Sequence, residues 1–273
     1  MNLCSSTQNE GEWVSPKEEW QSVAEYILFL KQSKAYEYVK PYCNDKCILD
    51  YGCGTGYGVM TISEHAKSVI GVDINRQIID HCNERYRKVN VSFTQVSAEC
   101  PLPYENGLFD IIVSFQVIEH LPDVQRYLYE LRRLLKDEGL LFIATPNRCF
   151  RLLPFEKPWN PEHIREYSYR SLNNELRQSF AEVRIFGIHG DDKVDSIERK
   201  RVYRSPMKHL AGIILPKSVI SSIQARRHKS NTTAVDKNRL IIGDTLLQKF
   251  SLTDFDIGKY TSRCLDLMAV CHK

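Results

Sequence analysis

The sequence predicts an α/β protein with a doubly wound, mostly parallel sheet of seven strands, an antiparallel last strand and a partly helical insert before that strand. Three observations predict it. An apolar run from Cys47 ends in Asp50, and glycines follow at alternate positions, as where a buried strand turns tightly into a helix. A second apolar run ends in Asp73. Helix-like and strand-like patterns then alternate as far as residue 188, which is typical of parallel strands joined by helices.

The glycine loop indicates the kind of ligand. The dinucleotide fingerprint G-x-G-x-x-G would need its third glycine at Tyr57 or Val59, so a nicotinamide dinucleotide is disfavoured. The loop instead has the form D-x-G-x-G-x-G, which resembles motif I of the class I S-adenosylmethionine-dependent methyltransferases. This resemblance implies a Rossmann-like enzyme whose product is S-adenosylhomocysteine. It also implies that the methionine end of the cofactor is held by Asp50, Tyr51, Gly52, Cys53, Gly54 and Gly56.

The composition is that of an ordinary globular protein. Hydrophobic residues make up 42% of the chain and charged residues 26%, and a net charge of +3 is too small to imply a nucleic-acid binder by itself. Nine cysteines without a zinc spacing favour reduced thiols and a cytoplasmic protein. The polar start, Met1–Gly11, has no apolar signal region, and no apolar stretch of the sequence is long enough to span a bilayer.

The first helix is expected to begin at Ser15, before Pro16, and to end near Val39. Its apolar stripe is formed by Trp20, Val23, Ala24, Ile27 and Leu28. The resemblance implies that this helix covers the cofactor or the substrate, but a helix that only packs on the sheet fits the periodicity equally well. A second helix is expected over 59–64, directly after the glycine loop.

The second strand, 68–73, ends in an acid that lies 21 positions after Gly52. This spacing fits a hydrogen bond from Asp73, beside Ile74, to the ribose of the cofactor. The alternative is that Asp73 caps the helix expected over 75–87. The third strand, 91–96, is followed by Ser97, Ala98 and Glu99. The resembled family often has an acid at the position of Ser97, and that acid holds the adenine amino group. The resemblance therefore implies that Ser97, Ala98 and Glu99 contact the cofactor. Glu99 is alternatively a solvated charge of the loop.

The resemblance is strongest around the fourth strand, 109–115. There "FDIIVSFQVIEHLPD" and "LRRLLKDEGLLFIATPN" are similar to small-molecule methyltransferases, which implies that Phe115 and Gln116 contact the cofactor. Ubiquinone-type O-methyltransferases bind a divalent metal with the help of an acid at the position of Gln116, so no metal is expected. A helix should follow, with Pro122 in its first turn, Gly139 at its C-terminal cap, and an apolar face formed by Val124, Leu128, Leu131 and Leu135. A buried strand, 140–144, is expected after it.

The segment "NPEHIREYS", 160–168, resembles a motif of bacterial methyltransferases from cell-surface polysaccharide pathways. Ser168 is expected to cap a helix that ends near Phe180. Further strands are expected over 181–188 and 264–271, and the resembled fold implies that these two are antiparallel.

Two histidines are candidates for a general base, because histidine titrates near the working pH. His120 follows the fourth strand, at the carboxyl edge of the sheet where ligands bind. His163 lies in the "NPEHIREYS" segment. Each is alternatively a histidine that only bonds to the backbone, and Glu119 is an alternative group to orient His120 or the substrate.

Three segments are expected: a core with N-terminal cap helices over 1–190, a basic insert or lid over 191–263 and the final core strand over 264–273. Between Arg199 and Arg239 the insert interleaves eleven basic residues with apolar ones. This pattern suits contact with an anionic membrane or an anionic substrate, although a solvated lid remains open. The protein would then be cytoplasmic, with the inner membrane face as a peripheral site.

The leading functional hypothesis is O-methylation of a sugar or a lipid-linked glycan intermediate. The alternatives are a quinone precursor or small phenol as acceptor, a tRNA methyltransferase, and a cofactor-binding scaffold without catalysis. Without a recognisable RNA-binding module, a nucleic-acid partner is not expected.

Overall fold

The computed structural model describes residues 20, 22–97, 101–152, 156–158, 160–202 and 248–273. The helix start expected at Ser15 lies outside these residues. So do Ala98, Glu99 and most of the basic insert.

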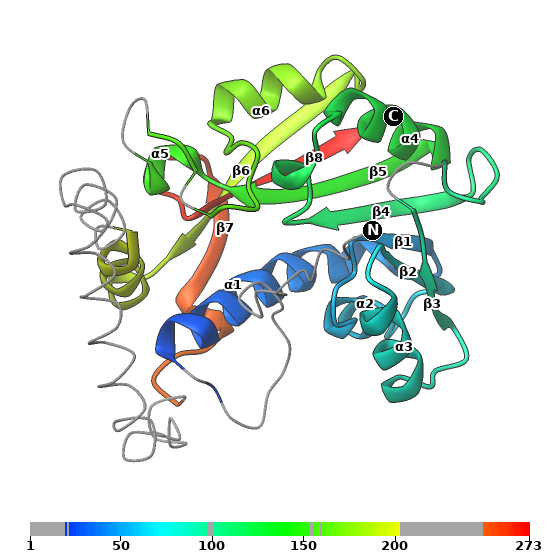
Figure 1. Ribbon diagram of the computed structural model, residues 1–273, viewed down its shortest axis with the longest axis horizontal. Helices are drawn as coiled ribbons and strands as arrows, with labels where there is room; N and C mark the ends of the chain where they lie inside the picture. The colour runs from blue at the N-terminus through cyan, green and yellow to red at the C-terminus, as the bar shows by residue number, and fades with distance from the viewer. Residues whose placement is uncertain (1–19, 21, 98–100, 153–155, 159, 203–247) are drawn as a thin grey trace, which may run out of the picture.

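The described chain forms one eight-stranded sheet with the order β3-β2-β1-β4-β5-β8-β6-β7 (Figure 1). Neighbours from β3 to β5 are parallel, while β8 is antiparallel to both β5 and β6. The doubly wound, mostly parallel sheet with an antiparallel last strand is therefore confirmed. The strands are β1 Cys47–Tyr51, β2 Ser68–Asp73, β3 Val91–Gln95, β4 Phe109–Phe115, β5 Leu135–Pro146, β6 Glu182–Gly190, β7 Phe255–Lys259 and β8 Asp266–His272.

The eighth strand, β7, was not predicted. It pairs antiparallel with β6 at the edge of the sheet, and only Phe255 among its five residues is buried. A short edge strand with charged residues and a glycine gives a weak apolar pattern. The segment predicted as the insert therefore contributes a strand to the sheet, and residues 192–202 of that segment form a helix.

Helices cover both faces of the sheet, with α1, α2 and α3 on one side and α4 and α6 on the other (Figure 1). Among the described helices, none has both the length and the apolar character needed to cross a bilayer. The named helices are α1 Val23–Val39, α2 Tyr57–Ile62, α3 Arg76–Arg85, α4 Val124–Leu134, α5 Arg148–Arg151 and α6 Tyr169–Leu176, with 3₁₀ turns η1 Lys40–Tyr42, η2 Ile118–His120 and η3 Leu252–Asp254.

The caps of α3 and α6 follow from short polar side chains. Ser168 caps α6 as expected, through the backbone N–H of Ser171. The alternative role of Asp73 as the cap of α3 is wrong, because Asn75 takes that position and accepts from Gln77 and Ile78.

The helix α4 is shorter than predicted. Asp123 caps it, so Pro122 precedes the helix, and Gly139 is not its cap but lies inside β5. The reason is that Leu135, which was predicted to lie in the helix, pairs with Phe109 of β4 and is the first residue of β5. The chain therefore passes directly from helix to strand without a glycine turn.

The apolar face of α1 also differs from the predicted stripe. Trp20 and Ile27 are buried, but Val23, Ala24 and Leu28 are only partly buried. The buried face continues instead through Leu30, Lys31, Ala35, Tyr36 and Val39. An apolar stripe cannot include a charged residue such as Lys31, because lysine is usually exposed. This lysine is buried, so the predicted stripe missed part of the buried face.

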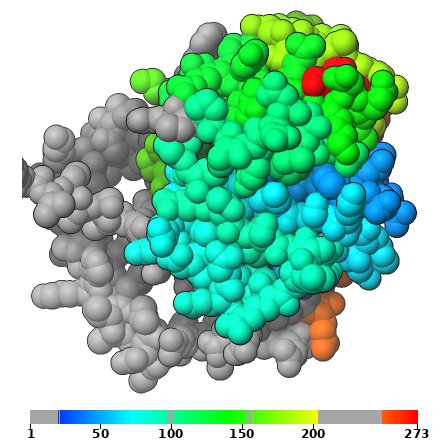
Figure 2. All heavy atoms as spheres, turned by 90° about the vertical axis from the view of Figure 1, so that its right-hand side faces the viewer, coloured from blue at the N-terminus to red at the C-terminus, as the bar shows by residue number. Residues whose placement is uncertain are grey.

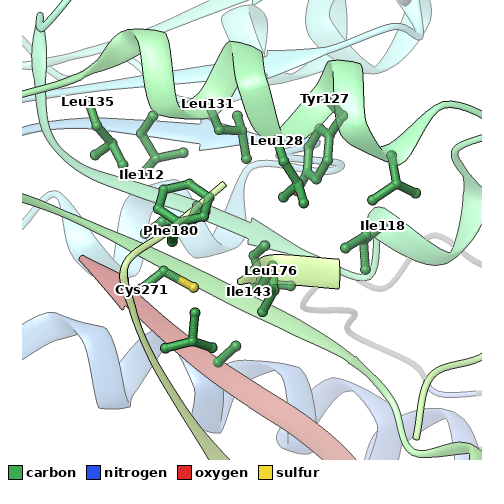
Figure 3. Close-up of a cluster of buried hydrophobic side chains, with 14 of the residues drawn as sticks. Ile112, Ile118, Tyr127, Leu128, Leu131, Leu135, Ile143, Leu176, Phe180 and Cys271 are labelled. Carbon is green, nitrogen blue, oxygen red and sulfur yellow. The ribbon is translucent and has the colours of Figure 1, made fainter. Parts of the chain in front are cut away.

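The larger apolar core lies under α4 and α6 (Figure 3). Leu128 and Leu131 of α4 have no exposed surface and face Ile112 and Ile143 of the central strands. Each fully buried leucine of this kind stabilises the fold by about 1.5–3 kcal/mol. The predicted apolar face of this helix is confirmed as far as Leu131, whereas Leu135 belongs to β5.

The strand β8 completes the sheet between β5 and β6. Red atoms from the C-terminal end of the chain accordingly reach the surface among green and yellow-green ones (Figure 2). Because β8 is antiparallel, its first residues lie beside the carboxyl ends of β4 and β5. This brings Asp266 to the edge where ligands bind in such sheets.

Candidate active site

The glycine loop is held against the end of β2. The backbone N–H groups of Gly52 and Cys53 donate to Val72 O at 2.8 and 3.0 Å, and Gly54 N donates to Asp73 Oδ2 at 3.1 Å. Gly52, Gly54 and Gly56 have φ angles of 81°, 50° and 77°, in the left-handed region that favours glycine. The loop thus presents its backbone with no side chain at alternate positions.

Asp50 lies beneath this loop with no exposed surface. The hydroxyl of Tyr36 donates to its Oδ2 at 3.0 Å, but its Oδ1 has no hydrogen-bond partner among the described residues. Burial raises the pKa of Asp50 to about 7, with the bond from Tyr36 opposing the shift. A buried carboxylate oxygen of this kind fits a bound ammonium group, such as the one at the methionine end of S-adenosylmethionine.

The side chains of two other predicted loop residues face the protein. Tyr51 packs against the ring of Tyr127 at 5.3 Å between centroids, and Cys53 is buried in the core on the opposite face of the sheet. Cys53 is therefore suited to contact a ligand only through its backbone, whereas the ring of Tyr51 is partly buried.

Asp73 ties the loop to α3. Its Oδ1 accepts from Asn75 N at 2.9 Å while its Oδ2 accepts from Gly54 N. Burial raises the pKa of Asp73, and these backbone bonds oppose the rise. The carboxylate sits at the end of β2, as the ribose hypothesis requires.

Next to Asp73 lies an open pocket of about 470 Å³. Ile74, which is 61% exposed, lines it together with Gln95, Val96 and Ser97. An exposed isoleucine beside polar groups suits a flat aromatic ring, such as adenine, that needs both an apolar face and hydrogen bonds. The structure thus brings together two of the predicted cofactor contacts, Ile74 and Ser97.

Phe115 and Gln116 end β4 at the same edge. The ring of Phe115 meets Tyr36 edge-on at 4.8 Å between centroids. Gln116 has a φ of 58°, an uncommon value for a residue other than glycine. Its side-chain amide donates to Asp266 Oδ2 at 3.1 Å, and Asp266 Oδ1 accepts from Lys31 Nζ at 2.7 Å. This buried chain of contacts attaches α1 to the end of β4.

The two candidate bases lie side by side. The rings of His120 and His163 meet at 90° with 4.8 Å between centroids. The backbone N–H groups of Ile164 and Arg165 donate to Glu119 O at 3.0 and 3.3 Å, which docks the loop of His163 on η2. Residues 43 positions apart in the sequence therefore form one group.

Glu119 is fully buried beneath the histidines. Thr145 donates to its Oε2 at 2.8 Å, and burial raises the pKa of Glu119 to about 7, with the charge of His163 opposing the rise. Nδ1 of His120 faces Glu162 O at 3.1 Å, so a backbone carbonyl helps to orient this ring. The orienting role of Glu119 stays a prediction. Glu119, His120 and His163 each offer one potential metal-ligand atom, all within 4.8 Å of one another. The absence of a metal, expected from Gln116, stays a prediction.

Sequence reasoning missed four residues of this region. Glu166 lies 3.2 Å from His163 Nδ1, and Arg151 lies 3.6 Å from the same carboxylate. The spacing of His163 and Glu166, three positions apart, was visible in the sequence. Arg151, Lys31 and Asp266 come from distant elements, and no local pattern marked them.

The comparisons with known proteins agree with this geometry. A family described as a methyltransferase domain matches residues 49–143. A probable S-adenosylmethionine-dependent methyltransferase of Mycobacterium tuberculosis is 32% identical over 206 residues, which cover 74% of each chain. A ubiquinone biosynthesis O-methyltransferase of Bartonella tribocorum is 28% identical over 53% of this chain and 62% of its own. A possible histamine N-methyltransferase of Thermotoga maritima, 17% identical, shares the fold over 91% of each chain with a TM-score of 0.56.

Proposed function

Because this chain belongs to the S-adenosylmethionine-dependent methyltransferase family, we propose that it methylates a hydroxyl group and that a histidine of the His120–His163 pair removes the proton. S-adenosylmethionine, when bound, supplies the methyl group from its sulfonium. The protein has little covalent work in such a displacement, so catalysis depends on positioning the acceptor and accepting its proton.

The cofactor would be held along the edge just described. Asp50 and the backbone of Gly52–Gly56 suit the methionine end, Asp73 suits the ribose, and Ile74 and Ser97 suit the adenine. Phe115 and Gln116 would close the site beside the sulfonium. These assignments are supported by the buried free oxygen of Asp50 and by the pocket next to Asp73.

The histidine pair is the observation that carries the proposal for a hydroxyl acceptor. An alcohol must lose its proton as it is methylated, and imidazole is the side chain best suited to accept that proton near neutral pH. Both rings lie at the carboxyl edge of β4, and each has its Nδ1 beside an acceptor oxygen. A donor Nδ1–H leaves Nε2 as the basic nitrogen.

For the acceptor class we favour a sugar or a lipid-linked glycan intermediate. The charged and polar side chains around the histidines suit an acceptor rich in hydroxyl groups. A quinone precursor or other phenol is the second candidate, and the similarity to ubiquinone biosynthesis O-methyltransferases supports it. Gln116, in place of the metal-binding acid that the resemblance implies for those enzymes, weighs against it.

The remaining alternatives have less support. A tRNA acceptor would rest only on the basic insert, which lies largely outside the described residues. A scaffold without catalysis is set aside because the chain is a methyltransferase.

The test is the formation of S-adenosylhomocysteine with a panel of sugars, glycan lipids and phenols. We expect His163→Ala or His120→Ala to lower turnover about 10²–10⁴-fold while cofactor affinity is kept. His81→Ala, which removes an exposed histidine of α3, is the matched control. Full turnover in both variants would remove the general-base proposal. The expected absence of a metal predicts that EDTA leaves turnover unchanged.

A further inference from the structure

His163 and Glu166 form a buried pair in the loop before α6. The Nδ1 atom of His163 lies 3.2 Å from Glu166 Oε1, and the two side chains are 4% and 0% exposed. The pair stands on a docked loop, because Ile164 and Arg165 both bond to the backbone of Glu119. A histidine and a carboxylate this close, held on a fixed backbone, have a defined relative orientation.

Resting on the proposed role of His163 as the base, we propose that Glu166 is the positioning residue of this base. Its carboxylate accepts the Nδ1–H of His163 and fixes the imidazole in the Nδ1-protonated tautomer. The acceptor hydroxyl then gives its proton to Nε2, and the carboxylate stabilises the imidazolium that forms. A carboxylate that orients a histidine in this way is known from hydrolytic triads.

Arg151 places Glu166 in turn. Its guanidinium lies 3.6 Å from Glu166 Oε1, and its side chain is 9% exposed. A buried cation this close attracts the carboxylate electrostatically. It also restrains rotation of that carboxylate away from His163.

The charge on His163 depends on groups from three elements. Glu166 contacts Nδ1, Glu119 and His120 approach from η2, and Arg151 of α5 lies behind Glu166. The two carboxylates favour the imidazolium, whereas Arg151 and a protonated His120 disfavour it. Since the Glu166 carboxylate lies 3.2 Å from Nδ1 of His163, its removal should have a large effect.

The comparison with His120 selects between the two candidate bases. Nδ1 of His120 faces a neutral carbonyl, Glu162 O, at 3.1 Å, and its side chain is more exposed than that of His163. Glu119 lies within 4.8 Å of a ring nitrogen of both histidines, so the additional carboxylate of Glu166 is what distinguishes His163. The geometry therefore favours His163 as the base and His120 as its neighbour.

The direct test is an NMR titration of the full chain with ¹⁵N-labelled histidine, with S-adenosylhomocysteine added and His163 assigned through His163→Gln. We expect the neutral ring to carry its proton on Nδ1. Glu166→Gln should lower the pKa of His163 by about one unit, because a charge that favours the imidazolium is lost. Glu166→Asp should restore part of the shift, and Glu162→Gln, an exposed acid of the same loop, should cause none.

A proton on Nε2 in the wild-type protein would overturn the proposal, and this result does not depend on any variant folding. An unchanged pKa in a folded Glu166→Gln protein would overturn it as well. With an acceptor from the panel, Glu166→Gln should lower kcat roughly tenfold or more, leave KM unchanged and move the acid limb of the pH profile to lower pH. If the titration behaves as expected but His163→Ala keeps full turnover, the base assignment fails while the His163–Glu166 bond stands.

Discussion

Asp50 has two opposing effects on the protein. Its carboxylate is fully buried, with one oxygen that has no partner among the described residues, so its charge destabilises the protein without cofactor. The same free oxygen suits a cationic ligand. Residues of this kind reduce stability in exchange for binding.

The pH dependence of stability should reveal this cost. The pKa of Asp50 is about 7 in the folded protein, above the value near 3.9 of an unfolded aspartate. The folded state therefore keeps a proton that the unfolded chain releases, and this contribution to the free energy of unfolding falls as pH rises from about 4 to about 7. Asp50→Asn removes it, so the variant without cofactor should be about 2–4 kcal/mol more stable than the wild type at pH 8.

Urea unfolding of the wild type and of Asp50→Asn at pH 4.5 and pH 8 measures the effect. The contributions of the other titrating groups are common to both proteins and cancel in the difference. The advantage of Asp50→Asn should nearly vanish at pH 4.5. An equal difference at both pH values would mean that Asp50 does not titrate in this range. Cofactor affinity should fall in the same variant.

Asp73→Ala is the test of the ribose assignment. The substitution removes the expected bonds to the ribose and also the bond from Gly54 N that holds the loop. We expect S-adenosylhomocysteine binding to weaken by roughly 1–3 kcal/mol in titration calorimetry. Asp80→Ala, on the exposed face of α3, should leave it unchanged. Wild-type affinity in Asp73→Ala would reject the assignment.

The sequence predicts which edge of the sheet the site residues occupy, but it does not predict their hydrogen-bond partners. Asp50 and Asp73 lie at the carboxyl ends of strands and His120 follows another. These ends must meet at one edge of the sheet, so the proximity of the three residues follows from topology. The bond between Asp266 and Gln116 joins residues 150 positions apart. It depends on where β8 enters the sheet, which no local pattern fixes.

At the scale of elements, the predicted strands of the core all exist because their apolar runs are strong. The predicted end of α4 and the predicted buried face of α1 were wrong, each because of one residue. Leu135 continued the predicted apolar face of α4 but begins β5. Lys31 was not part of the predicted apolar stripe of α1, yet it lies inside the protein. The edge strand β7 escaped notice because an edge needs little apolar surface.

The ion pair between Lys31 and Asp266 should be the strongest tie between α1 and the sheet. Its side chains are 4% and 2% exposed, so removing one partner leaves a buried charge. We expect Lys31→Met to destabilise the protein by about 3–5 kcal/mol in urea unfolding, and Lys31→Met/Asp266→Asn to recover most of the loss.

The matched control is Arg76→Ala, which breaks an exposed pair with Asp80. An exposed pair of this kind contributes less than about 1 kcal/mol. If Lys31→Met costs no more than the control, the buried pair does not anchor α1.

At the scale of the whole molecule, we propose the division into a core over 1–190, a basic insert over 191–263 whose strand β7 joins the core sheet, and a final strand over 264–273. In the described part of the insert, acidic neighbours offset the positive charge of two arginines. Arg199 pairs with Asp195 and Arg201 with Glu198, so these cations are partly neutralised. The other basic residues of the predicted stretch, apart from Lys200, lie outside the described residues.

Contact with an anionic membrane is the prediction for this segment. We expect cosedimentation with vesicles that contain anionic lipid, weakened by salt, and little with neutral vesicles. Each basic residue near such a surface adds about 1 kcal/mol, so replacing Lys208, Lys217 and Arg226 with alanine should reduce binding strongly. The matched control replaces three exposed basic residues of the core with alanine, Lys67, Arg132 and Arg170. It removes the same charge from a different part of the surface. Equal losses, or no binding to either vesicle type, would contradict a membrane role for the insert.

The place of β8 between β5 and β6 also bears on how the protein is made. On the ribosome, β5 is complete at Pro146, but its partner begins only at Asp266. Until that strand is synthesised, the nascent chain carries a long apolar strand with one edge unprotected. Edges of this kind join to other chains, and pairings between distant segments form slowly. The nascent chain is therefore open to pairing with other chains until β8 covers this edge.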